Sequence, residues 1–232
     1  MSFERIENAR GGRLAADEAA ASCRLLTWLA DAFWDVPSAW LASEFPDGEA
    51  GLLASRLASM AQATACVEEL FHADEDALRA ARVEYTALFC STDDGAPFPY
   101  ESVYHTQERL LMRPSRDDVV ACYEAAGYRP AQGDGNEPED HLSIQLRFLA
   151  ALTAVEGGIA DARVALADMS SEEARRMRED FAAEHVRSWL PRFSEEVEAR
   201  ARSPLYPALT ALAVELTELL ACKSDRSHRE DV

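Results

Sequence analysis

The sequence predicts an all-α protein, because apolar residues recur at spacings of three and four along nearly every apolar segment. No segment shows the sustained period of two, bounded by hairpin turns, that is typical of strands. With 48% apolar residues among 232, the chain can bury one good-sized core or two small ones. We therefore expect a helical bundle of about 9 to 11 helices in two lobes, residues 1–127 and 140–232, joined by a hinge loop at 128–139.

The N-terminal part of the chain is expected to form helices separated by proline and by acidic residues. Apolar residues follow one stripe from Asp17 to Trp34, and Pro37 ends this helix because proline has no backbone N–H to donate. A short helix is expected from Ser38. An alanine-rich helix follows at 49–71, and an acidic start that suits the helix dipole opens the next helix at 74–89.

Two stretches rich in proline and glycine interrupt the helices in the middle of the chain. Residues 93–99 hold two aspartates, a glycine and two prolines, and we expect a loop there. Ser115 and Asp118 resemble a capping box, which would open a helix that ends at Gly127. Residues 128–139 hold two prolines, two glycines and an asparagine, so they mark the expected boundary between the lobes.

Helices are expected again after this linker. Pro138 suits a first helical turn, and the apolar pattern continues from it to the next pair of glycines. Ser170 and Glu173 form a second capping box, which opens a helix that Pro191 is expected to break or bend. Residues 204–222 are expected to form the last apolar helix.

The charge of the chain favours some partners over others. Asp and Glu number 42 against 23 Lys and Arg, a formal net charge of -19 that repels phosphate backbones and attracts cationic partners. We therefore expect no nucleic-acid ligand. No run approaches the roughly 18 apolar residues of a membrane span, and the first 13 residues hold no apolar run that could serve as a secretory signal. We expect a cytoplasmic protein without membrane insertion.

Motifs of common enzymes are missing from the sequence. It holds no P-loop, no GxGxxG, no GxSxG and no HExxH, and no oxyanion-forming glycine pattern accompanies Ser102 and His105. The cysteines lie far apart, with no CxxC pair and no Cys/His cluster at zinc-ligand spacing, so we expect reduced, structural thiols and no metal site. These cysteines are Cys23, Cys66, Cys90, Cys122 and Cys222.

Residues 84–109 are unusually aromatic for a segment that contains a loop. Tyr85, Leu88 and Phe89 share one face of a predicted helix, and further aromatic residues follow in or just beyond the proline-stiffened loop: Phe98, Tyr100 and Tyr104. One interpretation is that these side chains fold down onto the core. The other is that they form the rim of a groove that binds an apolar peptide.

Residues 137–141, with the sequence EPEDH, form a second polar cluster at an expected helix start. Carboxylates there are typical helix caps, which contribute about 1 kcal/mol. Asp140 and His141 are adjacent, so on a helix they point about 100° apart and make a poor metal site. The pair could instead serve as a polar contact or as a pH-sensitive latch. A nucleotide- or metal-dependent hydrolase centred on these two residues is the enzyme alternative.

Several short motifs occur in a fixed order: Tyr85-x-x-Leu88-Phe89, Pro99-Tyr100-Glu101-Ser102-Val103-Tyr104, Tyr123-x-x-x-Gly127, Glu137-Pro138-x-Asp140-His141 and Leu146-x-Phe148-Leu149. Their order and separation resemble those of the TorD/DmsD family of redox-enzyme maturation chaperones. The resemblance covers residues 85–150 directly, and the helical pattern on either side agrees with it.

The resemblance implies a TorD-like all-helical fold and a cytoplasmic chaperone without enzymatic activity. Such chaperones serve molybdopterin-containing oxidoreductases that the twin-arginine pathway exports. They bind the twin-arginine (Tat) signal peptide or the catalytic subunit, and they delay export until the cofactor is loaded. Some relatives bind guanine nucleotide, so weak guanine-nucleotide binding is implied as well, with no other cofactor. The chain is expected to be a monomer or a domain-swapped dimer.

Carried over by position, the family's peptide-binding residues are Tyr85, Leu88, Phe89, Phe98, Pro99, Tyr100, Glu101, Ser102, Tyr104, Asp140 and His141. A twin-arginine signal has an arginine pair followed by an apolar segment, so its receptor needs carboxylates beside an apolar trough. The candidates for these carboxylates are Glu84, Asp93, Asp94, Glu101 and Asp140. A helical adaptor that binds only a folded partner is the remaining alternative.

Overall fold

The structure is a computed structural model, and it describes residues 14–41, 45, 52–91, 93, 95–130, 137–159, 166 and 168–221. Within these residues the chain is helical, and the only β-type pairing is one isolated bridge between Tyr100 and His141. The prediction of an all-α fold is therefore confirmed. The helices are α1 (Ala16–Trp34), α2 (Pro37–Trp40), α4 (Met60–Phe71), α5 (Glu75–Phe89), α6 (Glu101–Tyr104), α7 (Pro114–Ala125), α8 (Leu142–Gly157), α9 (Ser171–Phe181), the π-helical turn η3 (Ala182–Val186), α10 (Arg187–Arg200) and α11 (Leu205–Leu220).

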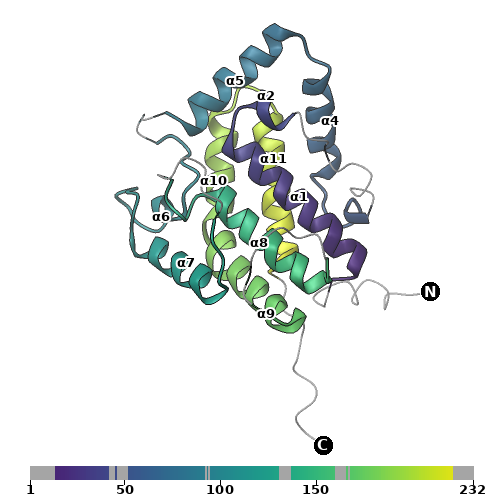
Figure 1. Cartoon of the computed structure of the whole chain (residues 1–232). Helices are drawn as coiled ribbons and strands as arrows, with labels where there is room; N and C mark the ends of the chain where they lie inside the picture. Colours follow the sequence, from purple (N-terminus) through teal and green to yellow (C-terminus); the bar gives the residue numbers. More distant parts are fainter. Residues whose placement is uncertain are drawn as a thin grey trace, which may run out of the picture.

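Helix α8 forms the centre of the bundle, and nearly all its side chains are buried. Helix α1 packs along it, α9 and η3 contact it, and α11 packs against α10, α4 and α1 (Figure 1). Helices α1 and α8 approach so closely that a Cβ added at Gly157 of α8 would lie 2.7 Å from the Cβ of Ala19 of α1. Glycine is therefore the residue that this crossing requires.

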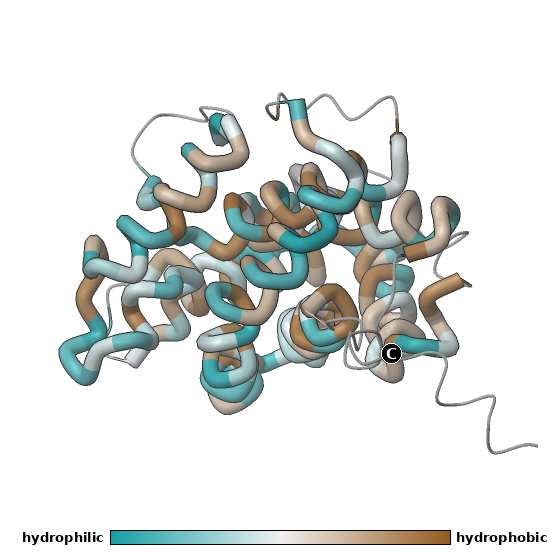
Figure 2. Tube along the Cα trace, turned by 90° about the horizontal axis from the view of Figure 1, so that it is seen from below, coloured by the Kyte–Doolittle hydropathy of each residue, from teal (hydrophilic) through white to brown (hydrophobic). Residues whose placement is uncertain are grey.

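One cluster of buried apolar side chains contains residues from both sides of the predicted linker, from Leu14 to Ala221. Apolar and polar stretches alternate along the same helices (Figure 2), as expected of helices that bury one face. The division into two lobes stays a prediction, and residues 131–136 of the linker lie outside the described residues. None of the described helices combines the length and the apolar character that crossing a membrane requires.

Helix boundaries in the N-terminal part agree in part with the sequence predictions. Helix α1 ends at Trp34 as predicted, but Pro37 is the first residue of α2, a position where its missing N–H costs nothing. The acidic start of α5 is confirmed, since the Asp74 side chain accepts a hydrogen bond from the Ala77 N–H at 2.9 Å. The alanine-rich helix begins only at Met60, after a series of turns.

Two predicted helix starts in the second half are wrong. Helix α7 already begins at Pro114, so Ser115 lies inside its first turn and does not cap it. Helix α8 begins at Leu142 and not at Pro138. The reason is the bridge: the Glu101 N–H donates to the Asp140 carbonyl, and the Leu142 N–H donates to the Pro99 carbonyl at 2.8 Å. These bonds keep the EPEDH segment out of the helix.

The second capping box is confirmed, and of the break or bend predicted at Pro191 the break does not occur. The Ser170 N–H donates to the Glu173 carboxylate at 2.9 Å, and the Glu173 N–H donates to the Ser170 hydroxyl at 3.3 Å. Pro191 lies inside α10. The helix widens just before it into the turn η3, where the Arg187 N–H bonds to the Ala182 carbonyl, five residues back. Such single turns occur as bulges inside otherwise continuous α-helices.

Candidate functional site

The face of α5 that the sequence offers as a trough is part of the core. Tyr85, Leu88 and Phe89 are only 6%, 3% and 7% exposed. The Phe89 ring lies 5.0 Å from that of Tyr206 and 6.0 Å from that of Phe33. Burial raises the pKa of the Tyr85 hydroxyl well above its usual value. The expectation that these three side chains line an open trough is therefore wrong, and the core interpretation holds for them.

The aromatic residues beyond the loop divide into buried and half-buried ones. Tyr104 is buried, stacks on Trp189 with ring centroids 5.3 Å apart, and donates from its hydroxyl to Glu196 at 3.1 Å. Phe98 and Tyr100 are half-buried and pack on the edge of the core, while Pro99 between them is buried. Of the predicted aromatic set, only Phe98 and Tyr100 keep part of their surface exposed.

The EPEDH segment and the start of α6 meet, as the ordered motifs suggest. Asp140 is fully buried, and its Oδ2 accepts a hydrogen bond from the Ser102 N–H at 2.8 Å across 38 residues of sequence. Asp140 therefore caps α6, where a carboxylate satisfies an unpaired N–H of the first turn. Tyr100 donates from its hydroxyl to Glu137 of the same segment. The site residues predicted at 99–102 and 140–141 thus form one structural junction.

His141 caps α8 and does not act as a latch near neutral pH. Its Nδ1 accepts a hydrogen bond from the Ser143 N–H at 3.1 Å, and its ring lies 5.3 Å from Trp34 and 4.9 Å from Tyr100. Burial, assisted by the charge of Arg147, lowers the pKa of His141 to about 3. The imidazole is therefore neutral over the physiological range, and the pH-latch expectation is wrong.

The hydrolase alternative finds little support at this junction. A general acid or base must reach its substrate, but Asp140 and His141 are 0% and 6% exposed. Among the residues that the structure describes, no group of three or more His, Cys, Asp or Glu side chains is placed to hold a metal ion.

Most of the carboxylates that the sequence assigns to an arginine pair are already used inside the protein. Glu84 accepts hydrogen bonds from the N–H groups of Arg202 at 2.5 Å and Ser203 at 2.9 Å. Glu101 is buried against His185 and a glutamine, and Asp140 caps α6. Asp93 is exposed, and Asp94 lies outside the described residues.

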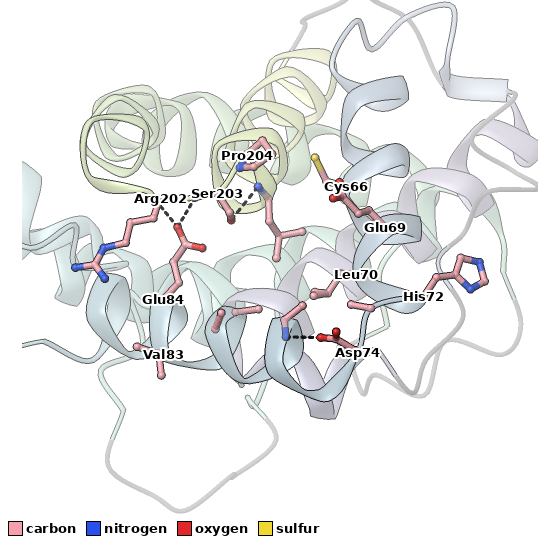
Figure 3. A pocket seen from close by; sticks show the side chains of 15 residues that line it. Cys66, Glu69, Leu70, His72, Asp74, Val83, Glu84, Arg202, Ser203 and Pro204 are labelled. Atoms are coloured by element: carbon pink, nitrogen blue, oxygen red, sulfur yellow. Dashed lines mark hydrogen bonds between the residues drawn. The ribbon is translucent and has the colours of Figure 1, made fainter.

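A cavity of about 680 Å³ opens between α4, α5 and the segment that leads into α11 (Figure 3). Leu70, Ala77, Ala80, Ala81 and Leu205 contribute apolar surface to it. Its size is within the range of ligand sites, about 300 to 1,000 Å³. Small side chains recurring at three- and four-residue spacing on α5 leave the space that larger ones would fill. This spacing is the sequence signal that the prediction missed.

The edge of this cavity combines apolar and acidic side chains. Val83, which lines the cavity, is 58% exposed. Glu69 and Asp74 supply carboxylates on the same wall as His72, and Arg202 lies on the opposite side (Figure 3). The cavity can therefore take an apolar side chain whose neighbours carry positive charge.

Comparison with known proteins identifies relatives over the middle of the chain. A family model described as "Nitrate reductase delta subunit" matches residues 51–195. The protein named "Chaperone protein TorD" from Vibrio cholerae serotype O1 is 34% identical over 140 residues, which cover 60% of this chain and 60% of that protein. Those of the same name from Aliivibrio salmonicida and Vibrio vulnificus are 28% identical over 148 residues (62% of this chain, 64% of that protein) and 32% identical over 121 residues (52% and 53%). The matches thus span about 60% of the length of these relatives.

Proposed function

The chain belongs to the nitrate reductase delta subunit family, and we propose on this basis that it is a chaperone, not an enzyme, for the maturation of a molybdopterin-containing oxidoreductase. Membership bears out the resemblance drawn from the ordered motifs, and its relatives are named as chaperones. The proposed partners are the twin-arginine signal peptide and the catalytic subunit of the client, which the chain holds in the cytoplasm until the cofactor is inserted.

The cavity between α4, α5 and the segment that leads into α11 is the proposed binding site for the signal peptide. A twin-arginine signal has two arginines followed by an apolar segment, and this cavity has an apolar floor beside the carboxylates of Glu69 and Asp74. Each large apolar side chain that becomes fully buried contributes roughly 1.5 to 3 kcal/mol. Exposed ion pairs contribute about 0 to 1 kcal/mol each, so they mainly steer and orient the peptide. Apolar contacts therefore retain the peptide, and the charges select it.

The site residues expected from the family differ in whether a bound client can reach them. Phe98 and Tyr100 keep exposed surface and can contact a bound client as the structure stands. Tyr85, Leu88 and Phe89 can do so only if the core opens. Guanine-nucleotide binding stays a prediction.

The test is calorimetric binding of a synthetic peptide with two arginines followed by a leucine-rich segment. We expect Val83→Asp, which places a charge at the mouth of the cavity, to weaken binding about tenfold or more, since a carboxylate there cannot be desolvated cheaply. Leu111→Asp is the matched control, because Leu111 is a similarly exposed apolar residue, 44% exposed, on the connection between α6 and α7. Equal affinity of both variants for the peptide contradicts the cavity as the binding site.

The helical adaptor alternative has one observation in its favour. Leu110, Leu111 and Met112 are 50%, 44% and 60% exposed, and this apolar run suits contact with a folded partner. A pull-down with client lacking its leader separates the two functions. If Leu111→Asp abolishes capture of the leaderless client while Val83→Asp has no effect on it or on peptide binding, the adaptor function is correct.

A further inference from the structure

Three side chains from separate helices form a chain of contacts that the proposed function does not use. The Cys122 Sγ of α7 lies 3.6 Å from the His185 Nε2 of η3. The opposite ring nitrogen of His185, Nδ1, lies 3.1 Å from Oε1 of Glu101 on α6. A thiol, an imidazole and a carboxylate in this order are the arrangement in which a base activates a nucleophile and an acid orients the base. No sequence motif links these three residues.

The carboxylate and the imidazole are held in fixed orientations. Glu101 is 2% exposed, and its Oε2 accepts a hydrogen bond from the Gln145 side chain at 2.5 Å. Gln145 in turn accepts a hydrogen bond from the Trp189 indole at 3.2 Å. The His185 ring packs on Phe181 with centroids 4.9 Å apart. The turn that carries His185 is the π-helical one, and such turns occur frequently at functional sites.

A second cavity gives a reagent access to the thiol. It measures about 510 Å³, lies between α7, α9 and η3, and is lined by both Cys122 and His185. Cys122 is half-buried, so its sulfur can be approached. The wall also holds four carboxylates and one guanidinium: Asp168, Glu173, Asp180, Glu184 and Arg176. This excess of acid repels anionic reagents and admits neutral or cationic ones.

We propose that Cys122 is a reactive thiol that His185 and Glu101 activate for exchange with neutral or cationic disulfides. The Cys122 thiolate attacks one sulfur of the disulfide, whose S–S bond breaks as the new S–S bond to Cys122 forms. The other half leaves as a thiolate and takes a proton from His185, which had received it from Cys122. Cys122 is oxidised to a mixed disulfide and the reagent is reduced to one thiol, so atoms and electrons balance.

The charge of the imidazole supports this mechanism. Burial lowers the pKa of His185, but its hydrogen bonds to Cys122 and Glu101 outweigh burial and raise it to about 10. The groups that face it are Cys122 from α7, Glu101 from α6 and the carboxylates of the cavity wall, and His105 reaches the same Glu101 oxygen at 3.4 Å. An imidazolium therefore lies beside the Cys122 sulfur at neutral pH.

Cys90 is the internal control for reactivity. It is the more exposed of the two cysteines, but burial of its sulfur and the charges of Glu137 and Asp35 raise the pKa of its thiol. Exposure alone therefore predicts that Cys90 reacts first, whereas activation by His185 predicts Cys122.

The experiment treats the full chain with cystamine, a cationic disulfide, and resolves the rate at each cysteine by peptide mass spectrometry. At pH 7 we expect Cys122 to react about three- to tenfold faster than Cys90, because His185 beside its sulfur assists formation of the attacking thiolate. His185→Gln should remove the rate difference between Cys122 and Cys90 by slowing Cys122, and it should leave the Cys90 rate unchanged. Cys122→Ser assigns the signal, and circular dichroism checks the folding of each variant.

Two further measurements on folded protein test the role of Cys122 even if His185→Gln does not fold. In the wild type, the Cys122 rate should rise less steeply with pH than the rate of an ordinary thiol, which increases about tenfold per pH unit below its pKa. The anionic dithiobis(nitrobenzoate) should react more slowly than cystamine at Cys122, and Glu184→Gln should narrow that difference. A Cys122 rate that is no faster than that of Cys90, or that rises tenfold per pH unit, overturns the proposal.

Discussion

Replacing Leu88 by alanine decides whether this face of α5 is core or binding surface. Leu88 is 3% exposed and belongs to the main apolar cluster. Truncating a buried leucine costs roughly 2 to 5 kcal/mol. For a chain of 232 residues each kcal/mol lowers Tm by about 2 to 4 °C, so Leu88→Ala should lower Tm by roughly 4 to 20 °C. Val83→Ala on the same helix, at a side chain 58% exposed, should change stability by less than about 0.5 kcal/mol.

The assay is thermal and urea unfolding followed by far-UV circular dichroism, combined with peptide calorimetry well below Tm. We expect folded Leu88→Ala to bind the arginine-leucine peptide as the wild type does, because its side chain does not reach the cavity between α4 and α5. A variant that melts with the wild type but loses the peptide would falsify the assignment of this face to the core.

Further predictions concern charge. Arg178→Met should cost roughly 3 to 5 kcal/mol in urea unfolding, because it leaves the buried Glu156 carboxylate, 2.7 Å from Arg178 Nε, without its partner; adding Glu156→Gln should recover part of this. Asp140→Ala should cost roughly 1 to 3 kcal/mol by the same assay, since the Ser102 N–H loses a charged acceptor. The pKa of His185 is higher in the folded than in the unfolded protein, so the protonated imidazole should stabilise the fold fully below about pH 6.5 and progressively less towards pH 10. The measurement is the difference in unfolding free energy between wild type and His185→Gln as a function of pH. In stopped-flow traces, salt should slow peptide association more than it changes dissociation.

Periodicity and capping residues predict the helices well wherever the determinants are local. The Ser170 and Glu173 capping box and the Asp74 cap depend on side chains three residues apart, and both form. The start of α8 could not be predicted in this way. Its first turn is fixed by the hydrogen bond from the Leu142 N–H to the carbonyl of Pro99, about forty residues earlier in the chain, and no local propensity encodes that pairing.

For the candidate site, too, local sequence patterns do not predict which side chains are buried and which are available to a partner. Helical spacing places Tyr85, Leu88 and Phe89 on one face, but a core face and a peptide groove have the same spacing. Only the packing of that face on Phe33 and Tyr206 separates the two. Likewise Glu84 has the sequence context of an exposed helical acid, yet it binds backbone N–H groups at the start of α11. Long-range contacts therefore decide which acids remain available to a partner.

The dimensions of the cavity set how tightly the chaperone can hold a peptide. A space of about 680 Å³ accommodates few large side chains; about three, fully buried, contribute roughly 5 to 9 kcal/mol. Association costs roughly 4 to 15 kcal/mol in lost freedom, and a micromolar Kd corresponds to about -8 kcal/mol. The cavity alone therefore supports at best about -5 kcal/mol, which corresponds to a Kd between micromolar and millimolar, and such weak binding suits a partner that must be released. A nanomolar Kd for the isolated peptide requires contacts beyond the cavity, and the half-buried Phe98 and Tyr100 are the first to test.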